Sequence, residues 1–239
     1  MNIFQGFPRS AFSFLAELSR RQDRDWFRAH KDEYIALWQR PMESLLETLA
    51  AQLSRLYPGV NEAPWKVFRI YTDTRFAPKR APFKNHVAGT LPLGVPPGEG
   101  SMLYVHIGLD ENIVAAGRWM MEPEQLSRLR DAIADDETGA PFARAVKAAV
   151  SKGFELYSFE QLKRVPSPYP KDHPRADLLK RKGLSFGFPS FKRSDAASPQ
   201  FASSIVKHAK TLAPIIRQLD AFTAASQSGG PSVRQRIDR

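Results

Sequence analysis

The sequence predicts an α+β fold, in which a mostly antiparallel sheet packs against helices from the N-terminal and C-terminal parts of the chain. Three observations predict it. Apolar residues recur at helical spacing in the first quarter of the chain, two segments rich in branched and aromatic residues flank a polar turn near the middle, and a long apolar stripe lies near the end. No stretch between them resembles a flexible linker, so we expect a single domain over residues 1–225 and a disordered basic tail over 226–239.

Helices are expected at the start of the chain. The spacing of apolar residues predicts one helix over 12–18 and a second over 26–38, joined near Gln22 and Asp23. A third helix is predicted to begin at Pro41, a residue that suits the first helical position, and to end before Pro58.

Strands are expected next. Residues 66–71 form the first candidate, and 102–109 and 113–119 should pair as an antiparallel hairpin. Alternation along the hairpin places Tyr104 and His106 on the face opposite Val105. The stretch 77–100 holds most of the proline and glycine of this region and is predicted to be a long ordered loop.

The second half of the chain alternates between the two kinds of pattern. Helices are predicted near 123–133 and 142–150, and strands over 154–159 and 184–188. The last helix carries apolar residues from Phe201 to Phe222, a stripe that should dock on the sheet, and Pro214 predicts a kink or a break within it.

Composition excludes several classes of protein. The 239 residues include no cysteine, so disulfides, thiol nucleophiles and thiolate metal sites are excluded. No stretch approaches the roughly 20 apolar residues that cross a bilayer, so we expect a cytoplasmic protein with no membrane partner.

Positive charge is concentrated in two segments. The chain carries a formal charge of +10, and residues 65–86 hold six basic residues against one acidic residue. Residues 163–193 hold nine against two. Such segments favour an anionic partner, although they also occur on surfaces that are merely solvated.

The densest candidate site is the run from Arg69 to His86. Guanidinium and ammonium groups on a proline-stiffened loop offer many hydrogen-bond donors to a phosphate or carboxylate, and Phe76 and Phe83 are expected mainly to anchor that loop. The candidate ligand-binding residues are Arg69, Asp73, Arg75, Arg80, Lys84 and His86.

At this run the chain resembles a family of bacterial and fungal proteins, the domain of unknown function 2461. The resemblance spans nearly the whole chain and is carried by the segments Phe4-Gln5-Gly6-Phe7, Trp26-Phe27, Asp73-Thr74-Arg75-Phe76, Gly117-Arg118-Trp119 and Asp172-His173-Pro174, with Pro82, Lys84 and His86. It implies family membership and no particular activity.

The sequence departs from the family pattern at three positions. Thr72 stands where an arginine is usual, Arg80 where a lysine is usual, and Phe83 where a tyrosine is usual. A Schiff-base lysine and a tyrosine acid are therefore excluded at the last two positions, which favours electrostatic holding over covalent catalysis at this loop.

The histidines suggest limited chemistry. His86 and His106 could supply a general base or two metal ligands, but their spacing matches no metal motif, so we expect no metal and no cofactor. His208 lies within an apolar stripe and is expected at the core or its boundary.

Three functions remain open. In the first, the two basic segments fold together and bind a phosphate-bearing or polyanionic ligand, either a phosphorylated small molecule or nucleic acid. In the second, the protein is an enzyme that acts on a small anionic substrate in a deep pocket beside the loop, with Asp73 or His86 moving a proton. In the third, it is a structural or interaction module whose loop pairs with acids such as Glu17 or Glu33.

Overall fold

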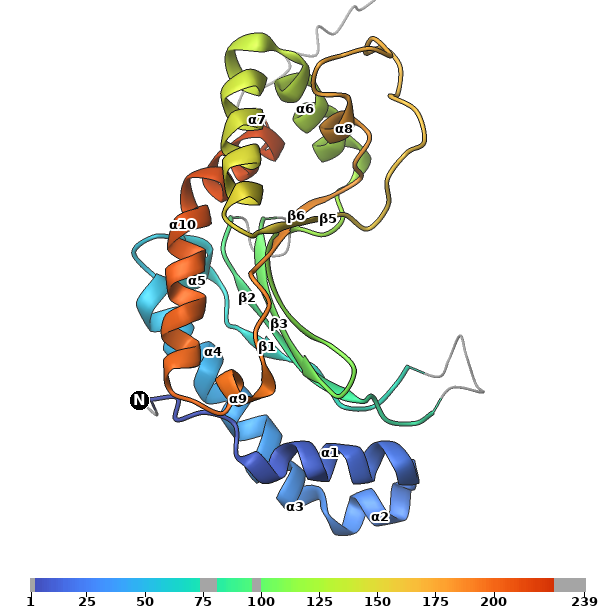
Figure 1. Cartoon of the computed structure of the whole chain (residues 1–239), viewed down its shortest axis with the longest axis vertical. Helices are drawn as coiled ribbons and strands as arrows, with labels where there is room; N and C mark the ends of the chain where they lie inside the picture. Colours follow the sequence, from blue (N-terminus) through green and yellow to red (C-terminus); the bar gives the residue numbers. More distant parts are fainter. Residues whose placement is uncertain (1–2, 74–80, 96–99, 226–239) are drawn as a thin grey trace, which may run out of the picture.

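The computed structural model describes residues 3–73, 81–95 and 100–225 of the chain. Its centre is a six-stranded antiparallel sheet in the order β1-β2-β3-β4-β6-β5, and helices from both ends of the chain pack against it (Figure 1). The predicted α+β class is confirmed. The strands are β1 (Lys66–Val67), β2 (His86–Pro92), β3 (Met102–Gly108), β4 (Asn112–Arg118), β5 (Glu155–Tyr157) and β6 (Leu184–Gly187).

The N-terminal third is helical, as its spacing predicts. Asp23 separates the first two helices as an N-cap, because its side chain accepts hydrogen bonds from the backbone of Asp25 and Trp26. The elements are α1 (Arg9–Arg21), α2 (Arg24–Ala29), α3 (Lys31–Tyr34), the π-helix η1 (Ile35–Gln39), α4 (Arg40–Leu53) and α5 (Gly59–Glu62).

The helix predicted to begin at Pro41 is α4, which begins at Arg40 with Pro41 in its first turn, so the prediction is confirmed to within one residue. The sequence does not indicate that α4 continues the preceding helix, since the chain is helical without interruption from Lys31 to Leu53. Proline has no N–H for the usual bond to the carbonyl four residues earlier, and its ring crowds that carbonyl. The helix widens ahead of it, so that the N–H of Arg40 bonds to the carbonyl of Ile35, five residues back.

The second half of the chain supplies the other helices. They are α6 (Pro123–Ala134), α7 (Asp136–Ser151), α8 (Ala176–Leu179), α9 (Arg193–Ala196) and α10 (Gln200–Thr223). The predicted helices and strands of this half are confirmed. Of the two outcomes predicted at Pro214, a break does not occur, because α10 is one helix, while its last part turns away from the direction of its first part, as a kink predicts (Figure 1).

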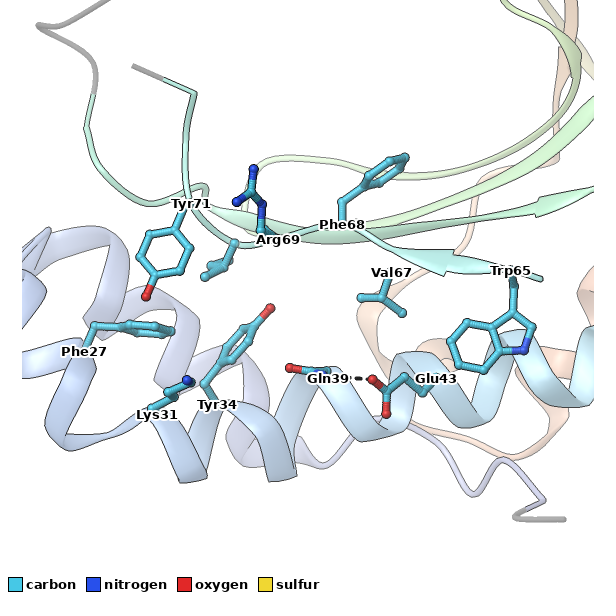
Figure 2. Close-up of a pocket in the computed structure, with 11 residues that line it drawn as sticks. Phe27, Lys31, Tyr34, Gln39, Glu43, Trp65, Val67, Phe68, Arg69 and Tyr71 are labelled. Carbon is cyan, nitrogen blue, oxygen red and sulfur yellow. Dashed lines mark hydrogen bonds between the residues drawn. The ribbon is translucent and has the colours of Figure 1, made fainter. Parts of the chain in front are cut away.

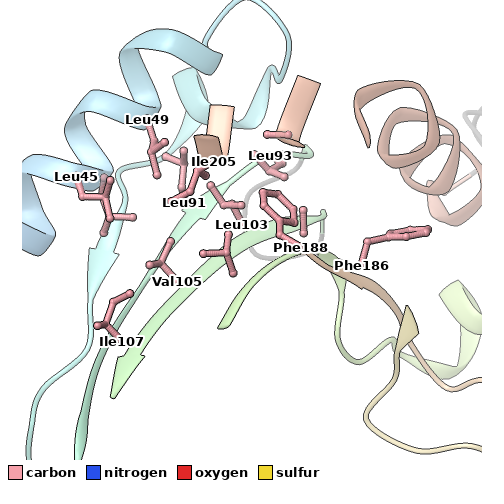
Figure 3. Close-up of a cluster of buried hydrophobic side chains, with 14 of the residues drawn as sticks. Leu45, Leu49, Leu91, Leu93, Leu103, Val105, Ile107, Phe186, Phe188 and Ile205 are labelled. Atoms are coloured by element: carbon pink, nitrogen blue, oxygen red, sulfur yellow. The ribbon is translucent and has the colours of Figure 1, made fainter. Parts of the chain in front are cut away.

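One face of the sheet forms the core with α4 and α10. Leu103, Val105 and Ile107 alternate along β3 toward this face and meet Leu45 of α4 and Ile205 of α10 (Figure 3). All five are buried. Truncating one such leucine or isoleucine to alanine in a packed core costs about 2–5 kcal/mol, so this layer fixes the sheet on which the candidate site is built.

A buried polar cluster also ties α10 to the sheet. Asp220 of α10 accepts hydrogen bonds from the backbone and hydroxyl of Ser101, at 2.9 and 2.8 Å, and pairs with Arg118 of β4 at 3.0 Å. Because Arg118 is only 5% exposed, its charge depends on this partner.

The predicted long loop over 77–100 is wrong for much of its length. Its central part is β2, which pairs with β3 from His86 to Pro92. Val87 and Leu91 are buried, while Gly89 sits where a Cβ would lie 2.7 Å from Leu46. Here glycine marks close helix–strand packing rather than a loop.

The first candidate strand is shorter than expected, because β1 covers only Lys66–Val67. The chain beyond it stays beside the segment 82–88 through a bridge between Tyr71 and Phe83 and through backbone hydrogen bonds from Phe68 to Ala88 and from Lys84 to Ile70. No helix in the described part of the chain is long and apolar enough to cross a lipid bilayer.

Candidate functional site

The face of the sheet that lies opposite α4 and α10 (Figure 1) is called the open face, and three of the predicted site residues come together there. Arg69, Lys84 and His86 gather there with His106 and Tyr104 of β3, and these five residues form the sheet-face cluster. Asp73 is exposed at the edge of the described residues, and we do not assign it to the cluster. Arg75, Lys79, Arg80 and Phe76 lie outside the described residues, as does the predicted tail.

The strand register brings the two histidines together. His86 pairs with Gly108 and His106 with Ala88, so the imidazoles are diagonal neighbours on one face. Their rings stack with centroids 4.0 Å apart. Gly108 leaves the room for this, since a Cβ there would lie 2.9 Å from the Cβ of His86. Nδ1 of His106 also forms a hydrogen bond with the Tyr104 hydroxyl at 3.0 Å.

Both imidazoles are neutral at pH 7. Burial, and then the neighbouring His106 and Lys84, lower the pKa of His86 to about 4. Burial and then Lys84 lower the pKa of His106 to about 4. Neutral imidazoles can donate or accept hydrogen bonds and can accept a proton, but they add no fixed charge to the site.

The fixed positive charge of the cluster comes from two neighbouring cations. The Lys84 ammonium donates a hydrogen bond to the backbone carbonyl of Arg69 at 3.0 Å. Burial lowers the pKa of Lys84, and the charge of Arg69 lowers it further. Among the described residues, no carboxylate forms an ion pair with either side chain. The two positive charges therefore repel each other, and a bound anion would reduce this repulsion.

Three smaller predictions concern Phe83, Glu17 and His208. Phe83 is 2% exposed and packs on Phe27, so its predicted role as an anchor is confirmed. Glu17 is an ion-pair partner of Arg20 and Arg21 within α1. The predicted boundary position of His208 is also confirmed, because it is half-buried between Phe154 and Phe188.

The second basic segment does not reach the cluster, and the expectation that the two segments fold together is wrong for residues 163–182. These residues surround α8 at one end of the molecule, whereas the cluster lies toward the other end (Figure 1). Several of their cations have internal partners. Arg175 pairs with Asp136, Lys180 with Asp177 and Lys182 with Glu160, at 2.6–2.8 Å.

A separate groove of about 230 Å³ lies on the helical side of the segment 65–71 (Figure 2). The helical stretch α3-η1-α4 forms its floor, while Trp65, Val67 and Tyr71 point down into it from above. Arg69 and Phe68 point the opposite way, toward the open face (Figure 2). One short segment of backbone thus separates the groove from the cluster.

The sequence matches one family, described as Conserved hypothetical protein (DUF2461), over residues 10–217. The chain belongs to this family. The DUF2461 match includes every strand of the sheet, the cluster and the groove. No curated protein and no solved structure matches the chain.

Some residues of the two sites in this DUF2461 protein are not visible as site residues in the sequence. His106 and Tyr104 were placed on one strand face, but their contact with His86 depends on the register of β2, which was predicted to be a loop. Within the described residues, no three histidine or acidic side chains form a group suited to a metal ion. For the groove residues Tyr34, Gln39 and Glu43, the one indication in the sequence is Pro41, a proline within a long helical pattern.

Proposed function

We propose that this protein binds a phosphate-bearing or polyanionic ligand on the open face of its sheet, with Arg69 and Lys84 as the cationic contacts. The observation that supports it is the proximity of these two cations without a carboxylate partner among the described residues. Neutral imidazoles beside them add hydrogen-bond donors that repel neither the ligand nor the cations. The ligand is expected to be a phosphorylated small molecule or nucleic acid, as the basic run predicts. Of the six candidate binding residues, the cluster contains Arg69, Lys84 and His86.

The test is isothermal titration calorimetry with pyrophosphate and with a heparin oligosaccharide. The double variant Arg69→Ala/Lys84→Met should lower affinity at least about tenfold, a loss of about 1.4 kcal/mol. The matched control Lys180→Met/Lys182→Met removes the same net charge from residues that already have internal partners, and it should change affinity less than about twofold. Equal losses in both variants would show that only overall charge matters, and the proposal would fail.

The salt dependence separates the two kinds of ligand. Binding of a polyanion through several phosphate or sulfate contacts releases counterions, so its affinity should fall steeply between about 50 and 200 mM salt. A compact anion held by two cations and two imidazoles should show a shallower dependence. Binding of neither probe at low salt would contradict the proposal.

The stacked imidazoles favour a second proposal, an enzyme that acts on a small anionic substrate. His86 is neutral and half-buried beside Lys84, so it can accept a proton while the cations hold the anion. If so, His86→Asn should reduce turnover of a phosphoester by about 10²-fold or more while pyrophosphate binding is retained. Binding without turnover across a set of phosphoesters would count against catalysis but not against binding.

A further inference from the structure

We propose that the groove between the segment 65–71 and the helical stretch α3-η1-α4 binds a small organic primary ammonium ion, with Glu43 as its carboxylate partner. This site is separate from the sheet-face cluster and does not depend on the function proposed for it. Three features of the groove carry the inference: its acceptor oxygens, its aromatic walls, and the location of its charges (Figure 2).

Three side chains that follow one another along the helical stretch, Tyr34, Gln39 and Glu43, direct acceptor oxygens into the groove. The amide nitrogen of Gln39 uses one of its two N–H donors on Glu43 Oε1 at 2.9 Å, and the Gln39 carbonyl is directed toward Tyr34 (Figure 2). The second carboxylate oxygen of Glu43 adds another acceptor. A primary ammonium ion carries three N–H donors and no acceptor, which matches such a row.

The Tyr34 hydroxyl is open to the groove. Tyr34 as a whole is 6% exposed, but its hydroxyl points into the groove and forms no hydrogen bond with another described residue (Figure 2). A tyrosine whose ring is buried and whose hydroxyl stays accessible can donate to or accept from a ligand. Burial raises the pKa of Tyr34 and the charge of Glu43 raises it further, so the hydroxyl stays neutral.

Aromatic rings line the groove on several sides. Trp65 stands over Glu43, and Tyr71 and Phe27 lie at the other end (Figure 2). A cation over the face of such a ring gains about 0.5–2 kcal/mol, most with tryptophan. The volume of about 230 Å³ lies below the usual range for drug-sized ligands. It suits an amine that carries one small apolar group.

Lys31 also lines the groove, but it lies at the far end from Glu43. Twelve residues of helix separate them, or roughly 18 Å along the axis. This exceeds the Debye length of about 8–10 Å at physiological salt, so Lys31 does not offset the carboxylate of Glu43 for a ligand bound beside it. No described residue forms an ion pair with Glu43.

The π-helix explains why these oxygens share one side. The wide turn at Ile35–Gln39 lies just before Pro41, and its extra residue places Gln39, five residues after Tyr34, on the groove side with Glu43. Turns of this kind occur often at functional sites. Here the distortion supplies two of the three acceptors.

The test uses nuclear magnetic resonance titration of the full chain with phenethylamine and with hydrocinnamate, which has a similar size and a carboxylate in place of the amine. Phenethylamine should bind at least tenfold more tightly. Its quaternary trimethyl analogue should bind more weakly than the primary amine, because it has no N–H to donate to the acceptor row.

Variants locate the site. Glu43→Gln should weaken phenethylamine binding tenfold or more, and Tyr34→Phe should weaken it severalfold. Glu47→Gln is the matched control, because Glu47 lies one turn further along α4 and does not line the groove. Circular dichroism melting checks that each variant is folded. Equal binding of amine and carboxylate, equal effects of Glu43→Gln and Glu47→Gln, or no saturation by about 10 mM amine would overturn the proposal.

Discussion

The two basic segments of this protein look alike in sequence and differ in structure. In residues 163–182, Arg175 is buried and donates to the last carbonyls of α6 and to Asp136. In residues 65–86, Arg69 is exposed, and within the described part of the chain Lys84 has a backbone carbonyl and no carboxylate as its hydrogen-bond partner. A cation that closes a helix end holds the fold together, whereas a cation left beside another cation remains available to a ligand. Local density of lysine and arginine therefore does not identify a binding site by itself.

The largest expected effect separates the segments by stability. Arg175→Ala should lower the free energy of unfolding by about 2–4 kcal/mol, because it leaves buried carbonyls at the end of α6 without donors. Arg69→Ala should change the free energy of unfolding by less than about 0.5 kcal/mol. Urea denaturation measures both. If Arg69→Ala destabilises as much as Arg175→Ala, the contrast between the segments is wrong.

A pH titration should sharpen the description of the first segment. The folded pKa of His86 and of His106 is about 4, below the ordinary value of 6.5. As the pH falls, these histidines are protonated in the unfolded chain before they are protonated in the folded protein. The free energy of unfolding should therefore decrease between about pH 6.5 and about pH 4. The variant His86→Asn/His106→Asn should show a weaker decrease over that window. Parallel pH profiles for the variant and the native protein would exclude a coupled, buried pair.

The smallest expected effect concerns the exposed pairs of the second segment. Lys182 and Glu160 are 37% and 51% exposed in their side chains, and such pairs contribute little. Lys182→Met should change the free energy of unfolding by less than about 0.5 kcal/mol in urea denaturation. A loss above about 1 kcal/mol would mean that this exposed pair, like Arg175, contributes substantially to the free energy of unfolding.

Local patterns predict most of the fold. Apolar spacing predicts α1, α6, α7 and α10, and the turn at 110–112 predicts the β3–β4 hairpin. The errors arise where tertiary contacts override local preference. β2 contains Gly89 and ends at Pro92, and it is a strand because it pairs with β1 and β3 and packs against α4. The π turn ahead of Pro41 keeps the chain helical into α4, where Met42 and Leu45 are fully buried.

The candidate sites were predictable only in part. Arg69, Lys84 and His86 stand in one basic run, so composition indicates them. His106 joins them through strand register, which no local pattern specifies. The groove depends on the approach of the segment 65–71 to a helix that ends more than ten residues earlier, and its acceptors are ordinary tyrosine, glutamine and glutamate side chains. Their significance becomes visible only when the fold directs all three into one groove (Figure 2).

The segment 65–71 forms a wall shared by two compartments, with Arg69 directed to one and Val67 to the other (Figure 2). Because the segment 65–71 is a single stretch of backbone, a shift of its atoms changes the groove and the sheet-face cluster together. If both compartments are occupied as proposed, a molecule that immobilises this wall from either side changes the affinity on the opposite side by the same factor, as thermodynamic linkage requires. The protein would then respond to the coincidence of an anion and an amine rather than to either one alone.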